Sequence, residues 1–348
     1  MDQHQPPLPV LSQRDKDMLT IAGFTLGKKT LKRGSISRLV SGKFGHESQP
    51  IAVKVIPLST GPRVPFQGEY AEFYNYDRYV SRNLKHDHLL KIYDLFICQH
   101  SSSGEAGGLH PPQEGGEHAG QQRTSTSSSP LSKSLFIFLE LATGGSLEDL
   151  LAEQDSPLSE VEARFYYLQF GAAVHYMHSL EFEHGNIKCE KILLVDEERR
   201  VCKLTDFVFQ RQCFPLPNTT TIATATSSLI KNTFCPSAAY LAPEVLRCPV
   251  RSRRLQRPEM PAVDQLDSDV WSVGVVLYAL LHRRLPFTAW NLRAFLDSQL
   301  QKQFTLDRGL SAQAKQFISD HLEPNYAGRP SMEMLMEHPW LKQGRADV

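Results

Sequence analysis

The spacing of hydrophobic and polar residues is typical of strands up to about residue 140 and mainly typical of helices after it. Between residues of about 24 and 98, the runs FTLGKKTL, RLVSGKF, IAVKVI and LLKIYDLFI are typical of strands, with one helical stretch at about 70–84. One more buried strand, SLFIFLEL, precedes a region in which helical patterns dominate. The pattern predicts an α+β fold in which a small sheet is followed by a larger helical part.

A helix is predicted from Ser159 onward. Ser159 and Glu162 form an S-x-x-E capping box, and apolar residues follow at helical spacing at Val161, Phe165, Leu168 and Ala172. This helix leads into the stretch HGNIKCEKILL at 184–194. The runs KILLV and RVCKLTDF beyond it are typical of short paired strands.

Two polar segments interrupt the pattern. Residues 100–134 are rich in Ser, Gly, Pro and Gln, so we expect a disordered insert, either a plain flexible loop or, at TSTSSSP, a phosphorylated segment. The Arg-rich segment at 249–265 is expected to be a solvated loop, with a local anion or partner site as the alternative. The expected parts are a polar tail at 1–23, a sheet lobe at 24–142, a helical lobe at 143–342 and a short tail at 343–348.

Composition narrows the classes of function. The chain has 348 residues, and its 38 Lys and Arg equal its 38 Asp and Glu, so no net charge attracts nucleic acid or an anionic membrane. The six Cys form no C-x-x-C pair, so we expect free thiols and no structural zinc. The N-terminus is unlike a signal peptide, and the longest apolar run, near 270–281, is too short for a bilayer span. We expect a cytoplasmic protein.

Several short motifs occur in one order: AVKV at 52–55, HGNIKCEK at 184–191, DF at 206–207, YLAPEV at 240–245, DVWSVG at 269–274 and HPW at 338–340. Each is weak alone, but their order and spacing resemble a protein kinase over about residues 24–342. The stretches IKNTFCPSAAYLAPEVL and CKLTDFVFQRQC are similar to the testis-specific serine/threonine kinases, a branch related to the calcium/calmodulin-dependent kinases. The resemblance implies a two-lobed fold with an antiparallel sheet lobe.

The resemblance also implies a nucleotide site in the sheet lobe. Lys54 matches the cation that contacts the phosphates, and Asp77 falls at the position of its helical carboxylate partner, with Glu72 as an alternative. The phosphate-binding loop keeps only Gly34, because Lys32 and Ser37 replace two glycines. The same resemblance assigns Leu139 and Leu141, at the end of the strand SLFIFLEL, to the nucleotide site.

The catalytic loop departs most from the family pattern. Asn186 occupies the place of the Asp base, and Lys191 that of the Asn that holds a magnesium ion. Gly185 replaces the Arg that grips a phosphorylated activation segment in many kinases, while Lys188 is retained. Asp206 matches the metal-holding Asp, although Val208 stands where that motif has Gly.

Positions that frame the helical lobe match the family. Glu244 and Arg329 match an ion pair that ties the end of the activation segment to the helical lobe. Asp269 matches the Asp that caps the catalytic loop. The residues that frame the helical lobe are thus retained, whereas the residues for phosphoryl transfer are lost.

We therefore expect a pseudokinase that acts as a scaffold or allosteric regulator, with at most residual ATP binding and with weakened Mg²⁺ binding. The alternatives are a weakly active serine/threonine kinase and a structural module without nucleotide. We expect protein partners and neither nucleic acid nor a membrane. By family analogy, the protein would occur in germ cells or sperm and depend on a chaperone.

Overall fold

The computed structural model describes residues 10–33, 37–58, 78, 80–101, 132–207, 238–247, 265–289 and 291–343. Gly34, Asp77, Glu72, Val208 and most of both polar inserts lie outside these residues. The chain divides into two compact units, residues 1–73 with 92–140 and residues 74–91 with 141–348. Each unit is described by itself below.

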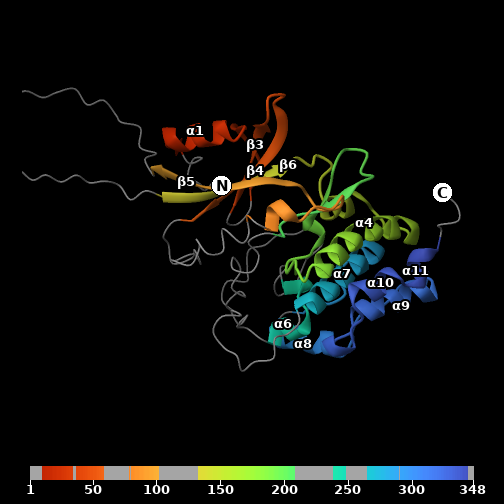
Figure 1. Ribbon diagram of the computed structural model, residues 1–348. Coiled ribbons are helices and arrows are strands. Elements are labelled where there is room, and N and C mark those ends of the chain that lie inside the picture. Colours follow the sequence, from red (N-terminus) through yellow and green to blue (C-terminus); the bar gives the residue numbers. More distant parts are fainter. Residues whose placement is uncertain are drawn as a thin grey trace, which may run out of the picture. The chain divides into compact units, whose positions relative to one another are not determined.

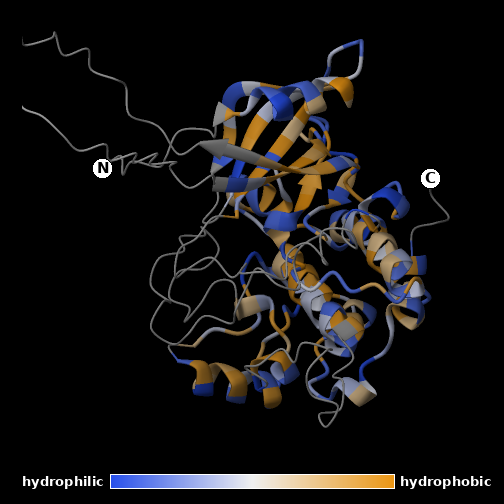
Figure 2. Ribbon diagram, turned by 60° about the vertical axis from the view of Figure 1, so that its left-hand side comes forward, coloured by the Kyte–Doolittle hydropathy of each residue, from blue (hydrophilic) through white to orange (hydrophobic). Residues whose placement is uncertain are grey.

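The first unit is built on one antiparallel sheet (Figure 1). Its strand order is β1-β5-β6-β4-β3-β2, and its strands are β1 (Val10–Leu11), β2 (Phe24–Arg33), β3 (Arg38–Phe44), β4 (Gln49–Pro57), β5 (Ile92–Ser101) and β6 (Ser132–Glu140). The central strand β4 lies between β3 and β6, so both its edges are paired. Figure 2 shows the strands as mainly hydrophobic, and their buried side chains form one core with four phenylalanines, Phe24, Phe96, Phe136 and Phe138. The predicted sheet is confirmed.

The N-terminal segment is not a polar tail throughout. Residues 10–21 form β1 and the helix α1 (Gln13–Ile21), which Ser12 caps by accepting a hydrogen bond from the backbone N–H of Asp15. Leu11 and Leu19 are buried in the sheet core. The expected tail at 1–23 is therefore wrong for residues 10–21, because Leu11 and Leu19 enter the core and Met18 packs against it.

The second unit is mainly helical (Figure 1). Its helices are α3 (Leu147–Glu153), α4 (Glu160–Ser179), α6 (Pro243–Arg247), α7 (Gln265–His282), α8 (Leu292–Leu300), α9 (Ala312–His321), α10 (Met332–Met336) and α11 (Pro339–Lys342), with short 3₁₀ turns η1 (Cys189–Lys191), η2 (Ala238–Tyr240) and η3 (Tyr326–Gly328). α7 packs against α4 and α9, and from Ser268 to Leu281 all of its residues are buried. Among the described residues, no helix is long and apolar enough to cross a membrane.

Helix α4 begins with the predicted capping box. The Ser159 side chain accepts from the N–H of Glu162, whose carboxylate accepts from the N–H of Ser159. The buried face of α4, however, carries Tyr167, Phe170 and Met177, whereas Val161 and Phe165 are exposed. Helix α4 is apolar on more than one face, so hydrophobic spacing alone did not identify the side that enters the core.

A two-stranded sheet follows the loop after α4. Strand β7 (Ile192–Leu194) pairs with β8 (Cys202–Leu204), as the sequence predicted. Residues 74–91 group with this unit rather than with the sheet lobe at 24–142. The reason is backbone pairing, since the N–H of Leu90 bonds to the carbonyl of Leu204, whose own N–H bonds to the carbonyl of His88.

Candidate functional site

The stretch 184–191, which resembles the catalytic loop of kinases, is held at its start by Asp269 from helix α7. Its carboxylate accepts hydrogen bonds from the backbone N–H groups of His184, at 2.7 Å, and Gly185, at 2.8 Å, and lies 3.2 Å from Nε2 of His178. Burial alone would raise the pKa of Asp269, but these hydrogen bonds lower it. A charged Asp269 thus fixes the backbone of the loop, as its resemblance to a capping Asp implies.

His184 links the loop to the segment before Asp206. Its Nδ1 accepts from the N–H of Asn186 at 3.2 Å, so Nε2 carries the proton and donates to the carbonyl of Thr205 at 2.9 Å. His184 is 1% exposed, and burial lowers its pKa. A neutral His184 therefore locks the two segments together.

Gly185 adopts a backbone conformation that suits glycine. Its φ is +74°, in the left-handed region, where a residue with a Cβ is strained. Gly185 occupies the position at which many of the kinases that this chain resembles have Arg. The substitution removes a positive side chain and, at the same time, relieves the backbone at a tight turn.

Four alternating charges follow along the loop. Nζ of Lys188 lies 2.9 Å from Oε1 of Glu190, and Nζ of Lys191 lies 3.4 Å from the same oxygen. Nζ of Lys191 also donates to Oδ2 of Asp206 at 2.7 Å. We call these four residues the charge row. Its formal charges sum to zero.

Local backbone pairing brings Lys191 to Asp206. The ladder between β7 and β8 continues by one more hydrogen bond, from the N–H of Thr205 to the carbonyl of Lys191 at 2.9 Å. The side chains that follow the two strands therefore meet at the end of the ladder. Asp206 has φ of +66°, so this carboxylate is held by a left-handed backbone that costs free energy.

Lys191 and Glu190 stay ionised at neutral pH. Burial alone would lower the pKa of Lys191, but Asp206 and Glu190 raise it. Burial alone would raise the pKa of Glu190, but Lys188 and Lys191 lower it. Sequence reasoning named both lysines and Asp206 and missed Glu190, although the run KCEK places an acid between the two bases.

The ion pair between Glu244 and Arg329 is formed as the sequence suggested. The guanidinium donates from Nη1 to Oε1 at 2.8 Å and from Nη2 to Oε2 at 3.1 Å. Arg329 also donates to the carbonyls of Asp267 and Glu323 and lies over the ring of Trp271. Its side chain has no exposed area, so this pair is a buried fixture of the helical unit.

The residues assigned to a nucleotide lie partly in the first unit. Lys54 sits on β4, opposite Leu39 of β3 and Ile137 of β6. Leu139 is 6% exposed and pairs with Ala52, whereas Leu141 begins the second unit and is half-buried. Lys32 is exposed on β2, and Gly34 and Asp77 lie outside the described residues.

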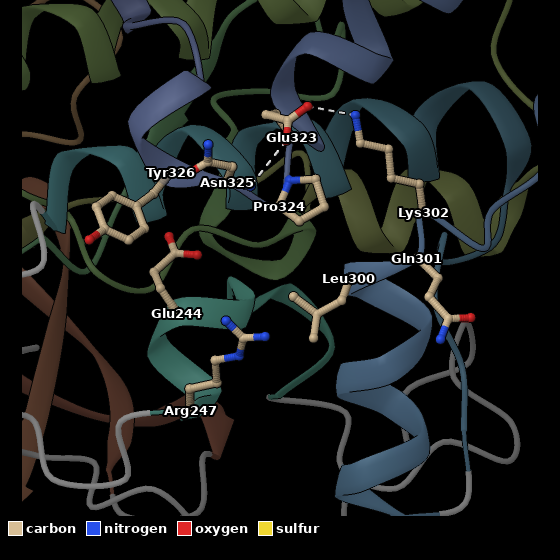
Figure 3. A pocket seen from close by; sticks show the side chains of 9 residues that line it. All are labelled: Glu244, Arg247, Leu300, Gln301, Lys302, Glu323, Pro324, Asn325 and Tyr326. Atoms are coloured by element: carbon tan, nitrogen blue, oxygen red, sulfur yellow. Dashed lines mark hydrogen bonds and ion pairs between the residues drawn. The ribbon is translucent and has the colours of Figure 1, made fainter.

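A pocket of about 620 Å³ lies elsewhere in the second unit (Figure 3). Its lining comes from α6, the end of α8 and the segment around η3: Glu244, Arg247, Leu300, Gln301, Lys302, Glu323, Pro324, Asn325 and Tyr326. In Figure 3 Lys302 faces Glu323, and the two form an ion pair at 2.6 Å. None of the assigned catalytic-loop residues lines this pocket, so it is not the nucleotide site that the resemblance implies.

Comparison with known proteins agrees with the order of motifs and the fold. The family model described as "Protein kinase domain" matches residues 27–341. The chain belongs to the protein kinase family. It is 28% identical to testis-specific serine/threonine-protein kinase 3 of Mus musculus, over 94% of this chain and 98% of that protein. It is 25% identical to testis-specific serine/threonine-protein kinase 1 of Homo sapiens, over 94% and 74%. A plant relative, CBL-interacting protein kinase 31 of Oryza sativa subsp. japonica, is 33% identical over 60% of this chain and 41% of its own.

Protein kinases in general use ATP with Mg²⁺, so the charge row can be compared with that requirement. A magnesium ion needs oxygen ligands, and here the ammonium group of Lys191 lies against the Asp206 carboxylate. Two cations at one carboxylate repel each other. The residues present therefore do not fit Mg²⁺ while this ion pair is closed.

Proposed function

We propose that this chain is a pseudokinase, a kinase-fold protein that acts by binding as a scaffold or allosteric regulator. The observation that carries the proposal is the ion pair of 2.7 Å between Lys191 and Asp206. An internal cation takes the place at which the family holds a metal ion. The formal charge of the whole row is already neutralised without Mg²⁺.

The residue in the position of the base supports the same proposal. Asn186 has an amide, which cannot accept a proton from a substrate hydroxyl at neutral pH. Loss of a general base costs about 10²–10⁴ in rate. Lys188, which the family uses near the transferred phosphate, is engaged by Glu190. The second candidate, a weakly active serine/threonine kinase, rests on Lys54, Lys188 and Asp206, which are all retained.

We infer that ATP, where it binds, does so with little dependence on Mg²⁺. The resemblance assigns Lys54 to the phosphates, and Lys191 neutralises Asp206 in place of a metal ion, so Mg²⁺ is not needed to offset that carboxylate. A third candidate, a structural module without nucleotide, would follow from the loss of glycines around Lys32 and Ser37.

Phosphotransfer to a generic Ser/Thr peptide tests the proposal. We expect the wild-type rate to lie at least about a hundredfold below the usual 1–100 per second. Asn186→Asp and Lys191→Asn together should raise the rate more than the two single changes combined, because positioning groups act as a unit. A wild-type rate in the ordinary range would refute the pseudokinase.

Titration of ATP in EDTA and then in millimolar Mg²⁺ tests the nucleotide site. We expect similar affinities in both buffers for the wild type and a clear gain with Mg²⁺ for Lys191→Asn. Strong enhancement by Mg²⁺ in the wild type would contradict the role of Lys191. Absence of binding in both buffers would favour the nucleotide-free module.

The cellular setting rests on the relatives and on the sequence pattern. Two relatives are named testis-specific, which suggests germ cells as the site of expression. The cytoplasm is proposed as the compartment from the sequence pattern. Protein partners, among them a chaperone, are proposed by analogy with the relatives. Staining of testis sections, with liver as the control tissue, would test the first point.

A further inference from the structure

The second unit has a shallow apolar hollow between α3 and α4, and none of the assigned catalytic-loop residues lines it. The hollow measures about 240 Å³, and its lining is mainly apolar: Leu150, Gln154, Leu158, Val161, Glu162, Phe165 and Tyr166. We call it the α3–α4 hollow. It plays no part in the proposed pseudokinase chemistry.

Two apolar side chains at the hollow are exposed. Val161 is 70% exposed and Phe165 is 46% exposed. They are four residues apart, so they lie on the same face of α4. An exposed pair of large apolar residues beside a hollow is a typical feature of a docking surface, whereas single ones are common on any protein.

The walls of the hollow are fixed in place. Leu158 donates its backbone N–H to the carbonyl of Leu280 on α7, and the capping box holds Ser159 and Glu162. The Tyr166 hydroxyl donates to the carbonyl of Arg199 at 2.9 Å. A preformed surface loses little conformational entropy when a partner binds.

The surroundings of the hollow are acidic. The stretch 153–162, EQDSPLSEVE, contains four carboxylates and no basic residue. Arg199 pairs with Glu153, and the buried Arg164 lies 3.9 Å from Glu160. Asp155 and Glu162 have no ion-pair partner among the described residues.

One positive side chain lies beside α3 and keeps its charge, because its acceptor is a neutral carbonyl. Arg283 donates its Nε–H to the carbonyl of Leu151 at 3.0 Å. Asp155, which lies in the chain between the lining residues Gln154 and Leu158, and the lining residue Glu162 outnumber the single charge of Arg283, so the edge of the hollow keeps a net negative charge. The surface combines an apolar centre with an acidic edge, and a complementary partner must combine apolar and basic side chains.

We propose that the α3–α4 hollow is a docking site for a protein partner, which inserts an apolar side chain of a short segment flanked by Lys or Arg. The apolar side chain covers Val161 and Phe165, and the basic side chains face Asp155 and Glu162. This goes beyond the proposed function, because it holds whether or not phosphotransfer remains.

A library of random 12-residue peptides displayed on phage tests the site on the full chain. We expect enriched peptides to carry at least two basic residues next to apolar ones. Their synthetic versions should bind Val161→Ser/Phe165→Ser at least about tenfold more weakly than wild type. Met334→Ser is the matched control, because Met334 is 65% exposed on α10 and lies outside the hollow.

Charge is tested separately. Asp155→Asn with Glu162→Gln removes both charges while Gln keeps the capping box. We expect weaker binding and a smaller dependence on salt than in the wild type.

Four results would overturn the proposal. The first is a selection on the wild type that enriches no peptide beyond those enriched on the double Ser variant. The second is a selection that enriches acidic peptides. The third is peptide affinity that is equal for wild type and the double Ser variant. The fourth is a wild-type dimer in light scattering that Val161→Ser converts to a monomer, since the face would then be a self-interface.

Discussion

Two stretches of one loop are held in different ways. At residues 184–186, buried Asp269 receives backbone hydrogen bonds and is 1% exposed. At residues 188–191, side chains pair with one another and with Asp206, and the Lys191 side chain is 21% exposed. The first arrangement holds the fold, and the second engages groups that the family uses in phosphoryl transfer. Fold stability and transfer chemistry can therefore change independently in this unit.

The largest predicted effect concerns the buried frame. Arg329→Ala should lower the free energy of unfolding by about 3–5 kcal/mol, because it leaves the Glu244 carboxylate buried without its cation. The measurement is urea unfolding followed by Trp fluorescence, since all three Trp belong to the second unit. Lys302→Ala is the control, because its pair with Glu323 is 43% and 29% exposed and should contribute less than about 1 kcal/mol. Equal losses would break the distinction between frame and surface.

The next effect is on pH dependence. His321 is fully buried, donates from Nδ1 to the carbonyl of Phe317 and accepts from the Tyr167 hydroxyl. Burial lowers the pKa of His321 to about 4. The unfolded chain, with a pKa near 6.5, binds this proton more readily, so stability is lost as pH falls below about 6.5 and the loss is complete below about 4.

This histidine should account for about 3 kcal/mol across that window. Unfolding measured from pH 7 to 4 should show a shallower decline in His321→Gln, whose oxygen can still accept from Tyr167. His46→Gln, at an exposed position, is the control for replacing a histidine by glutamine. Identical profiles for His321→Gln and wild type would exclude His321 as the titrating group.

A smaller effect is predicted at the turn of the loop. Gly185→Ala should cost about 1–2 kcal/mol, because a Cβ is strained at φ of +74°. Gly309→Ala, at a glycine without positive φ and with only Asp307 near its Cβ position, is the control and should be near neutral. Urea unfolding measures both. An unchanged Gly185→Ala would mean that the loop can relax, contrary to a rigid frame.

The smallest effect should come from the charge row. Lys191→Met should lower the free energy of unfolding by only about 1 kcal/mol, because the pair is partly open to water. Lys342→Met removes a surface pair with Glu337 and should be close to neutral. If Lys191→Met lowers the free energy of unfolding as much as Arg329→Ala does, Lys191 stabilises the fold in the same way as Arg329, and the two stretches of the loop do not differ.

Much of the fold could be predicted from the sequence. Strand-like runs predicted the sheet, the S-x-x-E pattern predicted the start of α4, and the order of motifs identified the family. These signals are local, because period, caps and short motifs depend on neighbouring residues. The segment at α1 was missed, since its apolar residues flank the polar run SQRDKD and give a weak local signal.

Individual substitutions in the loop could also be read directly. The sequence alone determined that Asn186 lacks a carboxylate and that Lys191 brings a cation. The chemistry of a side chain does not depend on the fold, so these conclusions needed only the match between this stretch and the family's motif.

Only the tertiary structure decided what those residues touch. Lys191 meets Asp206 because the β7–β8 ladder ends beside both, fifteen residues apart in the chain. Val161 and Phe165 are exposed because α7 and α9 pack on other faces of helix α4. One of these faces carries Tyr167, whose ring contacts Phe317 of α9. Burial and ion pairing result from packing between distant segments, and local patterns carry no information about which segments meet.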